Sequence, residues 1–376
     1  MSGAWLVAAR RTAVVPRNGA FRRLGVEALA APVVQKVLCD SGIEAGEVDE
    51  TILGNALYGG GNPARLAALA AGIPETKPAL TIDTQCCSGL DAIAAAADRV
   101  SGGACDVVLA GGVESYSRAP LRFARPMQSH EPASGYQRPP FTPWPDRDPD
   151  MIEAAVLLAE ELGIARAAQE IFAVESHRRA MQAQEALRSE IVPLENIDTD
   201  AFARRLSKAA CARLPVISGQ GTYAATAATV AVEADAAAVV IVVSERRLAA
   251  LKPVLQPILI AGHVRVAGDP MRPGLLTTTA AQALLTRHGL DASQISVAEI
   301  MEAFAAQAMG SIAALGLDPA RANRGGGALS RGHPIGASGA ILAVRLFHEL
   351  QLECDGFGLA TIAAAGGLGS ALLLAR

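Results

Sequence analysis

Charged and aromatic residues are scarce in this chain of 376 residues. Asp, Glu, Lys and Arg make up 19% of the sequence, against roughly 25% in typical globular proteins, and aromatic residues make up 4%. Hydrophobic residues still reach 51%, so the core must be built from Ala, Val, Leu and Ile. The 33 basic and 37 acidic residues give a net charge of −4 without a long run of either sign, which argues against nucleic acid and anionic membranes as partners.

Long apolar runs are also missing. A membrane-spanning helix needs about 18 to 20 consecutive apolar residues, whereas the best run, Ala236 to Val243, ends at Ser244 and Glu245. The apolar piece Ala4 to Ala9 is too short for a signal peptide, and it precedes its arginines instead of following them. We therefore expect no transmembrane segment and a cytoplasmic protein.

The cysteines do not form a disulfide framework, because six in so long a chain are too few. Only Cys86 and Cys87 are close in sequence, without the paired spacing of a zinc site, so no metal centre is predicted. The sequence also has no Walker motif, no Gly-x-Ser-x-Gly elbow and no His/Glu metal pattern. The six cysteines are Cys39, Cys86, Cys87, Cys105, Cys211 and Cys354.

Helical and extended segments alternate along most of the chain, which predicts an α/β fold with sheets between helix layers. In the first half we expect helices at 25–42, 62–72 and 89–100 and strands at 51–53, 78–84 and 106–110, the last stopped by Gly111 and Gly112. A strand at 236–243 follows. The last third repeats this outline, with helices at 275–288 and 337–350, extended segments at 257–260 and 299–304, and a closing strand at 358–365. Two similar halves are therefore predicted.

A proline-rich excursion interrupts this pattern. Residues 117–150 contain 8 of the 21 prolines, and helices resume at 151–162 and 168–187. We therefore divide the chain into three predicted parts. Residues 1–118 plus 219–250 form an N-terminal half, residues 119–218 an inserted loop domain, and residues 251–376 a C-terminal half.

Cys86 ends an extended run and is followed by Ser88, Gly89 and a predicted helix. A cysteine in the first turn of a helix faces unpaired N–H groups and the positive end of the helix dipole, which would lower its pKa and favour a reactive thiolate. The alternative is that a free cysteine is a small buried hydrophobe. We prefer that alternative for Cys87, because adjacent residues cannot both point into one pocket.

His333 lies between glycines, in Gly332-His333-Pro334-Ile335-Gly336, at a predicted turn ahead of a helix. Glycine allows a ligand or another backbone to come close. A lone histidine is more often a structural residue, but an imidazole is the usual activator of a thiol nucleophile. Cys86 and His333 together therefore predict a Cys–His catalytic pair.

Glycines also gather near the end, in Ala365-Gly366-Gly367-Leu368-Gly369. A dinucleotide fingerprint would need a following helix, and only seven residues come after Gly369. A strand followed by glycines whose N–H groups face a pocket suits an oxyanion hole better.

Taken together, these stretches resemble the thiolase family, the CoA-dependent acyltransferases that make or cleave 3-ketoacyl-CoA. The resemblance spans nearly the whole chain. It rests on Gly54-Asn55 with Asn62-Pro63-Ala64-Arg65, Cys86-Cys87-Ser88-Gly89-Leu90, Ala110-Gly111-Gly112-Val113-Glu114-Ser115, Glu302-Ala303-Phe304, and Gly332-His333-Pro334-Ile335-Gly336-Ala337-Ser338-Gly339.

The resemblance implies the thiolase fold, two βαβαβαββ halves in a five-layered α/β/α/β/α sandwich with an inserted loop domain that helps to bind CoA. It implies that Cys86 accepts the acyl group, that His333 activates it, and that the backbone N–H groups of Cys86 and Ala365 form an oxyanion hole. CoA thioesters are then the substrates and no other cofactor is needed. A homodimer or tetramer associated through core strands and a role in fatty acid metabolism are also implied.

Two positions depart from the family pattern. Ala363 stands where the family has a second cysteine that shuttles protons, and Met301 stands where it has the asparagine that holds an oxyanion-hole water. Gly325 also replaces an expected asparagine, although Asn323 is kept. In the CoA-contacting stretch only Thr229, in place of a serine, is carried over as a substrate-binding residue.

These departures leave three hypotheses. Acylation of Cys86 remains possible, but the Claisen half has lost an acid/base group of a kind that contributes about 10²–10⁴ in rate. The leading hypothesis is a thiolase-like acyltransferase acting on acyl-CoA and 3-ketoacyl-CoA thioesters. The alternatives are a decarboxylative condensing or deacylating Cys–His enzyme, and a catalytically silent acyl-CoA-binding subunit.

Overall fold

A ten-stranded mixed sheet forms the centre of the molecule. The computed structural model describes residues 3–128 and 130–376. The strands follow the order β12-β13-β14-β11-β1-β10-β5-β3-β4, and β2 pairs with β10. Their bounds are β1 Ala4–Arg11, β2 Val15–Pro16, β3 Glu50–Gly54, β4 Ala79–Ile82, β5 Val107–Ser115, β10 Ala234–Ser244, β11 Ile258–Ala267, β12 Ile295–Ile300, β13 Phe357–Ala364 and β14 Leu368–Ala375.

The sheet consists of two halves with matching strand pairings. In the N-terminal half, β3 is parallel to both β4 and β5, and β5, β10 and β1 then follow in antiparallel order. In the C-terminal half, β12 is parallel to β13 and makes a parallel bridge from Ala298 to Ala322, and β13, β14 and β11 follow in antiparallel order. The halves meet where β1 pairs with β11 through two residues of each strand. The predicted internal repeat is therefore present in the strand pairings.

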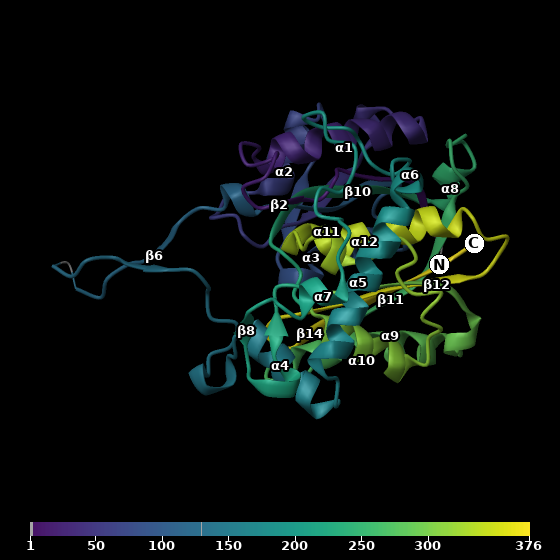
Figure 1. Cartoon of the computed structure of the whole chain (residues 1–376). Helices are drawn as coiled ribbons and strands as arrows, with labels where there is room; N and C mark the ends of the chain where they lie inside the picture. The colour runs from purple at the N-terminus through teal and green to yellow at the C-terminus, as the bar shows by residue number, and fades with distance from the viewer. Residues whose placement is uncertain (1–2, 129) are drawn as a thin grey trace.

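Helices form three layers around the two half-sheets, which gives the five layers expected from the resemblance (Figure 1). The outer helices of the N-terminal half are α1 (Val26–Ser41) and α2 (Pro63–Ala70), and those of the C-terminal half are α9 (Leu276–His288) and α10 (Ala305–Leu315). Between the half-sheets lie α3 (Ser88–Ser101) and α12 (Ile335–Leu350). Separate apolar clusters fill the central layer and each outer layer.

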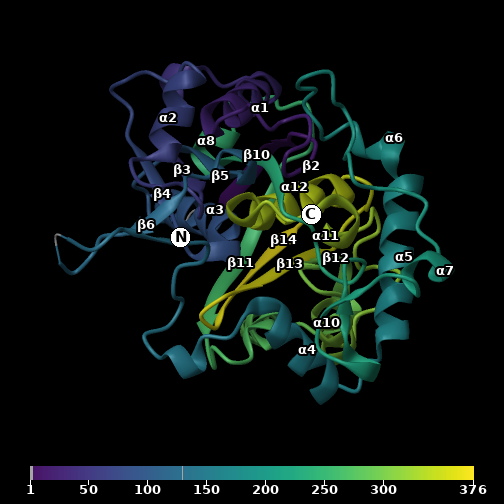
Figure 2. The ribbon, with the colours of Figure 1, turned by 60° about the vertical axis from the view of Figure 1, so that its left-hand side comes forward.

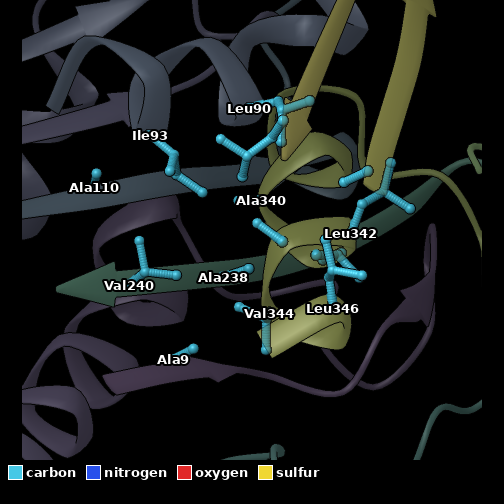
Figure 3. Packing of buried hydrophobic residues seen from close by; sticks show 14 of the residues in the cluster. Ala9, Leu90, Ile93, Ala110, Ala238, Val240, Ala340, Leu342, Val344 and Leu346 are labelled. Atoms are coloured by element: carbon cyan, nitrogen blue, oxygen red, sulfur yellow. The ribbon is translucent and has the colours of Figure 1, made fainter. Parts of the chain in front are cut away.

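Small residues let the central helices approach each other and the sheet. A Cβ on Gly89 of α3 would lie 2.8 Å from the backbone N of Ala340, and one on Gly339 of α12 would lie 2.5 Å from the N of Leu90. Side chains of α3 and α12 interleave with Ala110, Ala238 and other small residues of the strands (Figure 3). A core rich in Ala and poor in aromatics follows from this close layer packing.

Two expectations about strands were wrong. Gly111 and Gly112 do not stop β5, which runs on to Ser115. They serve close packing instead, because a Cβ on Gly112 would lie 2.1 Å from the carbonyl O of Gly336. The strand at 358–365 does not close the chain either, since the glycine turn leads into β14, which pairs antiparallel with β13.

The chain between β5 and β10 stays outside the main sheet. It forms two small antiparallel pairs, β6 with β7 and β8 with β9, and the β6–β7 pair projects from the body as an arm (Figures 1 and 2). No helix in the described part of the chain is long and apolar enough to cross a membrane. The elements of this segment are β6 Arg122–Ala124, β7 Ser134–Tyr136, α4 Met151–Glu161, α5 Arg166–Gln182, α6 Gln184–Leu187, α7 Lys208–Cys211, β8 Val216–Ser218 and β9 Ala225–Thr226; α8 (Glu245–Leu248) follows β10.

Candidate active site

Cys86 and His333 come together although 247 positions separate them. The Nε2 atom of His333 lies 3.2 Å from the Sγ atom of Cys86, and both side chains are partly buried. Cys86 lies in a 3₁₀ turn, Gln85–Cys87, immediately ahead of α3. His333 lies between the short helix α11 (Ala328–Arg331) and α12. Each half of the fold therefore contributes one residue of the pair, from the turn that precedes its central helix.

The backbone and one serine fix the orientation of His333. Gly332 has φ +114°, which glycine adopts readily, and the N–H of His333 donates to the carbonyl of Val232 at 2.8 Å. The ring Nδ1 lies 2.6 Å from the Oγ of Ser338. Because the Ser338 hydroxyl donates to the carbonyl of Pro334 at 3.0 Å, its oxygen is left to accept from Nδ1–H. That tautomer leaves Nε2 with a lone pair that faces the Cys86 sulfur.

Burial keeps both members of the pair uncharged. It raises the pKa of the Cys86 thiol to about 12, although the backbone N–H groups of Cys86 and Ala365 act in the opposite direction. It also lowers the pKa of His333 to about 4. The lowered thiol pKa expected from the helix terminus is therefore not found, since desolvation of the thiolate outweighs the nearby N–H groups. At neutral pH a neutral thiol faces a neutral imidazole.

The backbone N–H groups of Cys86 and Ala365 lower the pKa of the Cys86 thiol against the larger effect of burial. Ala365 directly follows β13, at the start of the glycine turn that leads to β14. These are the two groups predicted to form the oxyanion hole.

Glu114 connects the two halves next to this pair. Its carboxylate accepts from the N–H of Gly336 at 2.9 Å, from the Nδ2 of Asn55 at 2.8 Å and from the N–H of Ala56 at 3.0 Å. Burial raises its pKa to about 7. Glu114 therefore holds the start of α12, and with it His333, against the loop that follows β3.

Met301 and Ala363, the positions that depart from the family pattern, lie together in the structure. Both line a small, mostly apolar cavity to which α4 also contributes residues. The Met301 side chain is 2% exposed, and its N–H donates to the carbonyl of Thr361 at 3.0 Å. Thioether and methyl groups thus stand where the resemblance implies an amide and a thiol.

Asn323 and Gly325 have structural roles. The Asn323 side chain accepts from the N–H of Ile300 at 2.8 Å and donates to Glu302 at 2.7 Å, so it fixes the end of β12. A Cβ on Gly325 would lie 2.6 Å from a guanidinium nitrogen of the buried Arg345. The Arg345 side chain therefore takes the space that an asparagine at position 325 would need.

Thr229 is buried in a turn. Its hydroxyl accepts from the N–H of Thr226 at 3.0 Å and donates to the carbonyl of the same residue at 3.1 Å. Its own carbonyl accepts from the N–H of Ala305 at 3.0 Å. Substrate binding by Thr229 stays a prediction.

Sequence reasoning missed the residues that position the pair. Ser338, Glu114 and Asn55 all lie in motifs that were recognised, but no role was assigned to them. The position of Ser338 near His333 could have been predicted, because Ser338 lies in the first turn of a helix that begins at Ile335. No sequence pattern pointed to Glu114 and Gly336 as partners. Within the described residues, no group of three or more His, Cys, Asp or Glu side chains could hold a metal ion.

Comparison with known proteins identifies the family. Residues 4–246 match the family description "Thiolase, N-terminal domain", and residues 256–376 match "Thiolase, C-terminal domain". Two curated relatives carry the provisional name acetyl-CoA C-acetyltransferase. YhfS of Bacillus subtilis strain 168 is 38% identical over 374 residues, covering 98% of both chains, and VraB of Staphylococcus aureus strain MRSA252 is 36% identical over 386 residues, covering 100% of both.

Solved structures show the same architecture. The crystal structure of the Bacillus anthracis acetyl-CoA acetyltransferase superposes with a TM-score of 0.89 at 32% identity and covers 100% of this chain and 99% of its own. Human mitochondrial 3-ketoacyl-CoA thiolase in complex with CoA superposes with a TM-score of 0.90 at 27% identity, covering 100% and 98%. The predicted fold class and the predicted class of thiolase-type acyltransferase are confirmed. The chain belongs to the thiolase family.

Proposed function

We propose that this protein transfers acyl groups between CoA thioesters through a covalent acyl-Cys86 intermediate. The observation that carries the proposal is the 3.2 Å contact between the lone pair of His333 Nε2 and the Cys86 thiol. A CoA thioester as substrate is supported by the names of the relatives and by the human thiolase structure, which contains CoA.

The proposed acylation step needs a thiol, a base beside it and two backbone donors. His333 Nε2 takes the thiol proton as the Cys86 sulfur attacks the thioester carbonyl carbon. The negative charge on the carbonyl oxygen is stabilised by the N–H groups of Cys86 and Ala365. The bond between the carbonyl carbon and the CoA sulfur then breaks, and the imidazolium returns its proton to the CoA thiolate. Free CoA and a Cys86 thioester are the products.

The second half-reaction distinguishes two candidate functions. Thiolysis and condensation require a proton to be delivered to, or removed from, the carbon next to a thioester. The side chains of Met301 and Ala363 have no group that exchanges protons. This favours a second candidate function, a decarboxylative condensation, because loss of CO₂ generates the carbanion without a base. A deacylating enzyme needs only Cys86, His333 and water.

Mass spectrometry of the intact protein tests these candidates. The protein is incubated with acetyl-CoA, with acetoacetyl-CoA plus CoA, or with malonyl-CoA, beside Cys86→Ala as the control. An acyl adduct that Cys86→Ala lacks, together with acetyl-CoA formed from acetoacetyl-CoA, supports the acyltransferase. An adduct without turnover of acetoacetyl-CoA contradicts ordinary thiolase activity, and release of CO₂ from malonyl-CoA then supports the second candidate. The absence of an adduct from every donor leaves a silent acyl-CoA-binding subunit.

We also propose that the chain forms a homodimer through the sheet edge at β4. A tetramer would need further contacts between two such dimers. Among the residues that the structure describes, β4 pairs only with β3, so its outer edge is open. Leu80 on this strand is 38% exposed, and Leu66 and Leu69 of the adjacent α2 are also exposed. An open, apolar edge strand favours pairing with another strand. Sedimentation should show a dimer that Leu80→Lys dissociates; a monomeric wild type would contradict the proposal.

The predicted division of the chain into residues 1–118 plus 219–250, 119–218 and 251–376 is likewise a proposal. It is supported by the pairing of β5 with β10 across the inserted segment. Limited proteolysis should cleave first within 119–218, and initial cleavage within the half-sheets would contradict this division.

A further inference from the structure

Asp91 is a buried carboxylate that the proposed acylation step does not use. It lies in the first turn of α3 and is 3% exposed. Its Oδ2 accepts from the hydroxyl of Thr84 and its Oδ1 accepts from the hydroxyl of Ser370, each at 2.7 Å. Burial raises the pKa of Asp91, and both hydroxyl bonds oppose this by favouring the charged form. Because a hydroxyl has one proton to donate, both hydroxyls are committed to this carboxylate.

The bond to Thr84 acts on the turn that carries Cys86. Thr84 precedes this turn, and Gln85 between the two has φ +56°, a left-handed conformation that is uncommon outside glycine. Because a peptide unit is planar, the conformation of Gln85 sets the direction of the Cys86 N–H. A strained conformation persists only where surrounding contacts hold it. Asp91 supplies one of these contacts, and the Ser88 hydroxyl, which accepts from the N–H of Thr84 at 2.9 Å, supplies another.

The bond to Ser370 acts on the hairpin that carries Ala365. Ser370 lies on β14, opposite Ile362 of β13. Strand β13 ends at Ala364, so Ala365 is the first residue of the turn between the two strands. The Cys87 sulfur also lies 3.7 Å from the carbonyl oxygen of Ile362. The hairpin is therefore held against the start of α3 at one residue pair close to its turn.

We infer that Asp91 is a positioning residue that fixes the backbone N–H groups of Cys86 and Ala365 relative to each other. The inference rests on the proposed function, because these two groups form the proposed oxyanion hole. They come from different halves of the fold, and Asp91 joins the segments that carry them by charge-assisted hydrogen bonds, which are stronger than bonds between neutral groups. Removing one oxyanion donor costs about 10²–10³ in rate, so displacing one should cost less, about tenfold.

Two reactions of Cys86 separate this role from a general structural one. Acylation by acetyl-CoA places negative charge on a carbonyl oxygen. Alkylation by iodoacetamide places none there, because the sulfur forms its bond to carbon as iodide leaves and the thiol proton passes to His333. Asp91→Ala should therefore slow acylation about tenfold and leave alkylation at the wild-type rate. Asp91→Asn should restore acylation, since its amide can accept from one hydroxyl and donate to the other.

Mass spectrometry measures both reactions at Cys86, with Cys86→Ala as the blank, and circular dichroism checks that each variant is folded. Unchanged acylation in Asp91→Ala would overturn the inference, and so would an equal slowing of acylation and alkylation. A wild-type protein that iodoacetamide labels at Cys86 but that no acyl-CoA acylates would instead overturn the proposed function, and the inference with it.

Two further variants each break one of the bonds and keep Asp91. Thr84→Val and Ser370→Ala should each slow acylation about as much as Asp91→Ala, and the double variant should be no slower, because the two bonds act in series. Ser244→Ala is the matched control. The Ser244 hydroxyl donates to Asp106 at 2.6 Å beside the start of β5, whereas the site lies at the end of that strand. Equal acylation rates in Ser370→Ala and Ser244→Ala would overturn the inference.

Discussion

The two halves of the molecule carry the same architecture but contribute different chemistry. In the N-terminal half a 3₁₀ turn ahead of α3 presents Cys86, and in the C-terminal half a turn with a glycine at φ +114° ahead of α12 presents His333. The two helices pack against each other in the central layer. A repeated fold therefore places two equivalent turns face to face, and these turns carry the two residues that we propose as nucleophile and base.

The halves also differ in how firmly they hold these residues. Fourteen of the 16 residues of α12 are buried, against 10 of the 14 residues of α3. In addition, Arg345 of α12 forms buried ion pairs with Glu190, at 2.6 Å, and with Glu349. His333 is fixed through Val232, Ser338 and the adjoining start of α12. The imidazole orientation is thus coupled to α12, the more buried of the two central helices.

Removing either reactive residue should have the largest effect. Cys86→Ala should abolish the acyl adduct, because it removes the thiol that lies 3.2 Å from His333 Nε2. His333→Ala should slow acylation by about 10²–10⁴, the usual contribution of a positioned base. Adduct formation from acetyl-CoA, measured by intact mass, checks both. An unchanged rate in His333→Ala would mean that the C-terminal half supplies no base.

The contact between the halves can be weakened at Gly112. Gly112→Ala would place a Cβ 2.1 Å from the carbonyl of Gly336, so backbone must move and we expect a loss of about 3 kcal/mol in the free energy of unfolding. Gly46→Ala is the matched control, because nothing lies within 4 Å of its added Cβ, and it should stay within about 0.5 kcal/mol. Urea unfolding measures both. Equal stability of the two variants would contradict the close packing of β5 and α12.

A smaller effect is expected at Ser338. Ser338→Ala removes the group that holds Nδ1 of His333 and should slow acylation about tenfold, about 1.4 kcal/mol in barrier, without unfolding the protein. Ser41→Ala is a suitable control, since this serine also bonds a helix carbonyl, at 3.0 Å from Leu38, but lies in the outer helix α1. A rate equal to that of the control would show that the backbone alone orients the imidazole.

The smallest expected effect is the pH dependence between pH 6 and 8. His333 must be neutral to accept the thiol proton, and burial lowers its pKa to about 4, so its base form is complete above about pH 5. The titration of His333 should therefore change single-turnover acylation less than about 1.5-fold from pH 6 to 8, whereas an imidazole with the ordinary pKa of about 6.5 would give roughly a fourfold rise. A change that Glu114→Gln removes would come from Glu114, whose pKa burial raises to about 7. A tenfold rise per pH unit would instead indicate reaction through free thiolate.

Much of the fold could be predicted from local patterns. Alternating helices and strands, the repeat of the outline and the proline-rich excursion were visible because periodicity and turn residues are local signals. The role of Gly111 and Gly112 was not visible locally. Their meaning depends on Ala238 and Gly336, which approach them from distant parts of the chain.

The residues of the candidate site also fall into two groups, those that could be predicted from the sequence and those that could not. Cys86 and His333 could be predicted because each lies in a short motif of its own. Ser338 and Glu114 could not be assigned, since their importance lies in hydrogen bonds to His333 and Gly336 that only the folded chain makes. The direction of the Cys86 pKa shift was missed because burial of the sulfur is a tertiary property.

The separation of Cys86 and His333 by 247 positions has a consequence for the order of events during folding. Contacts between distant segments form late, because the long intervening chain must first be ordered. As the chain is synthesised from its N-terminus, the thiol is present long before α12 can pack beside α3. The nascent chain thus carries the Cys86 thiol without His333 beside it, and the pair exists only once both halves are complete and docked.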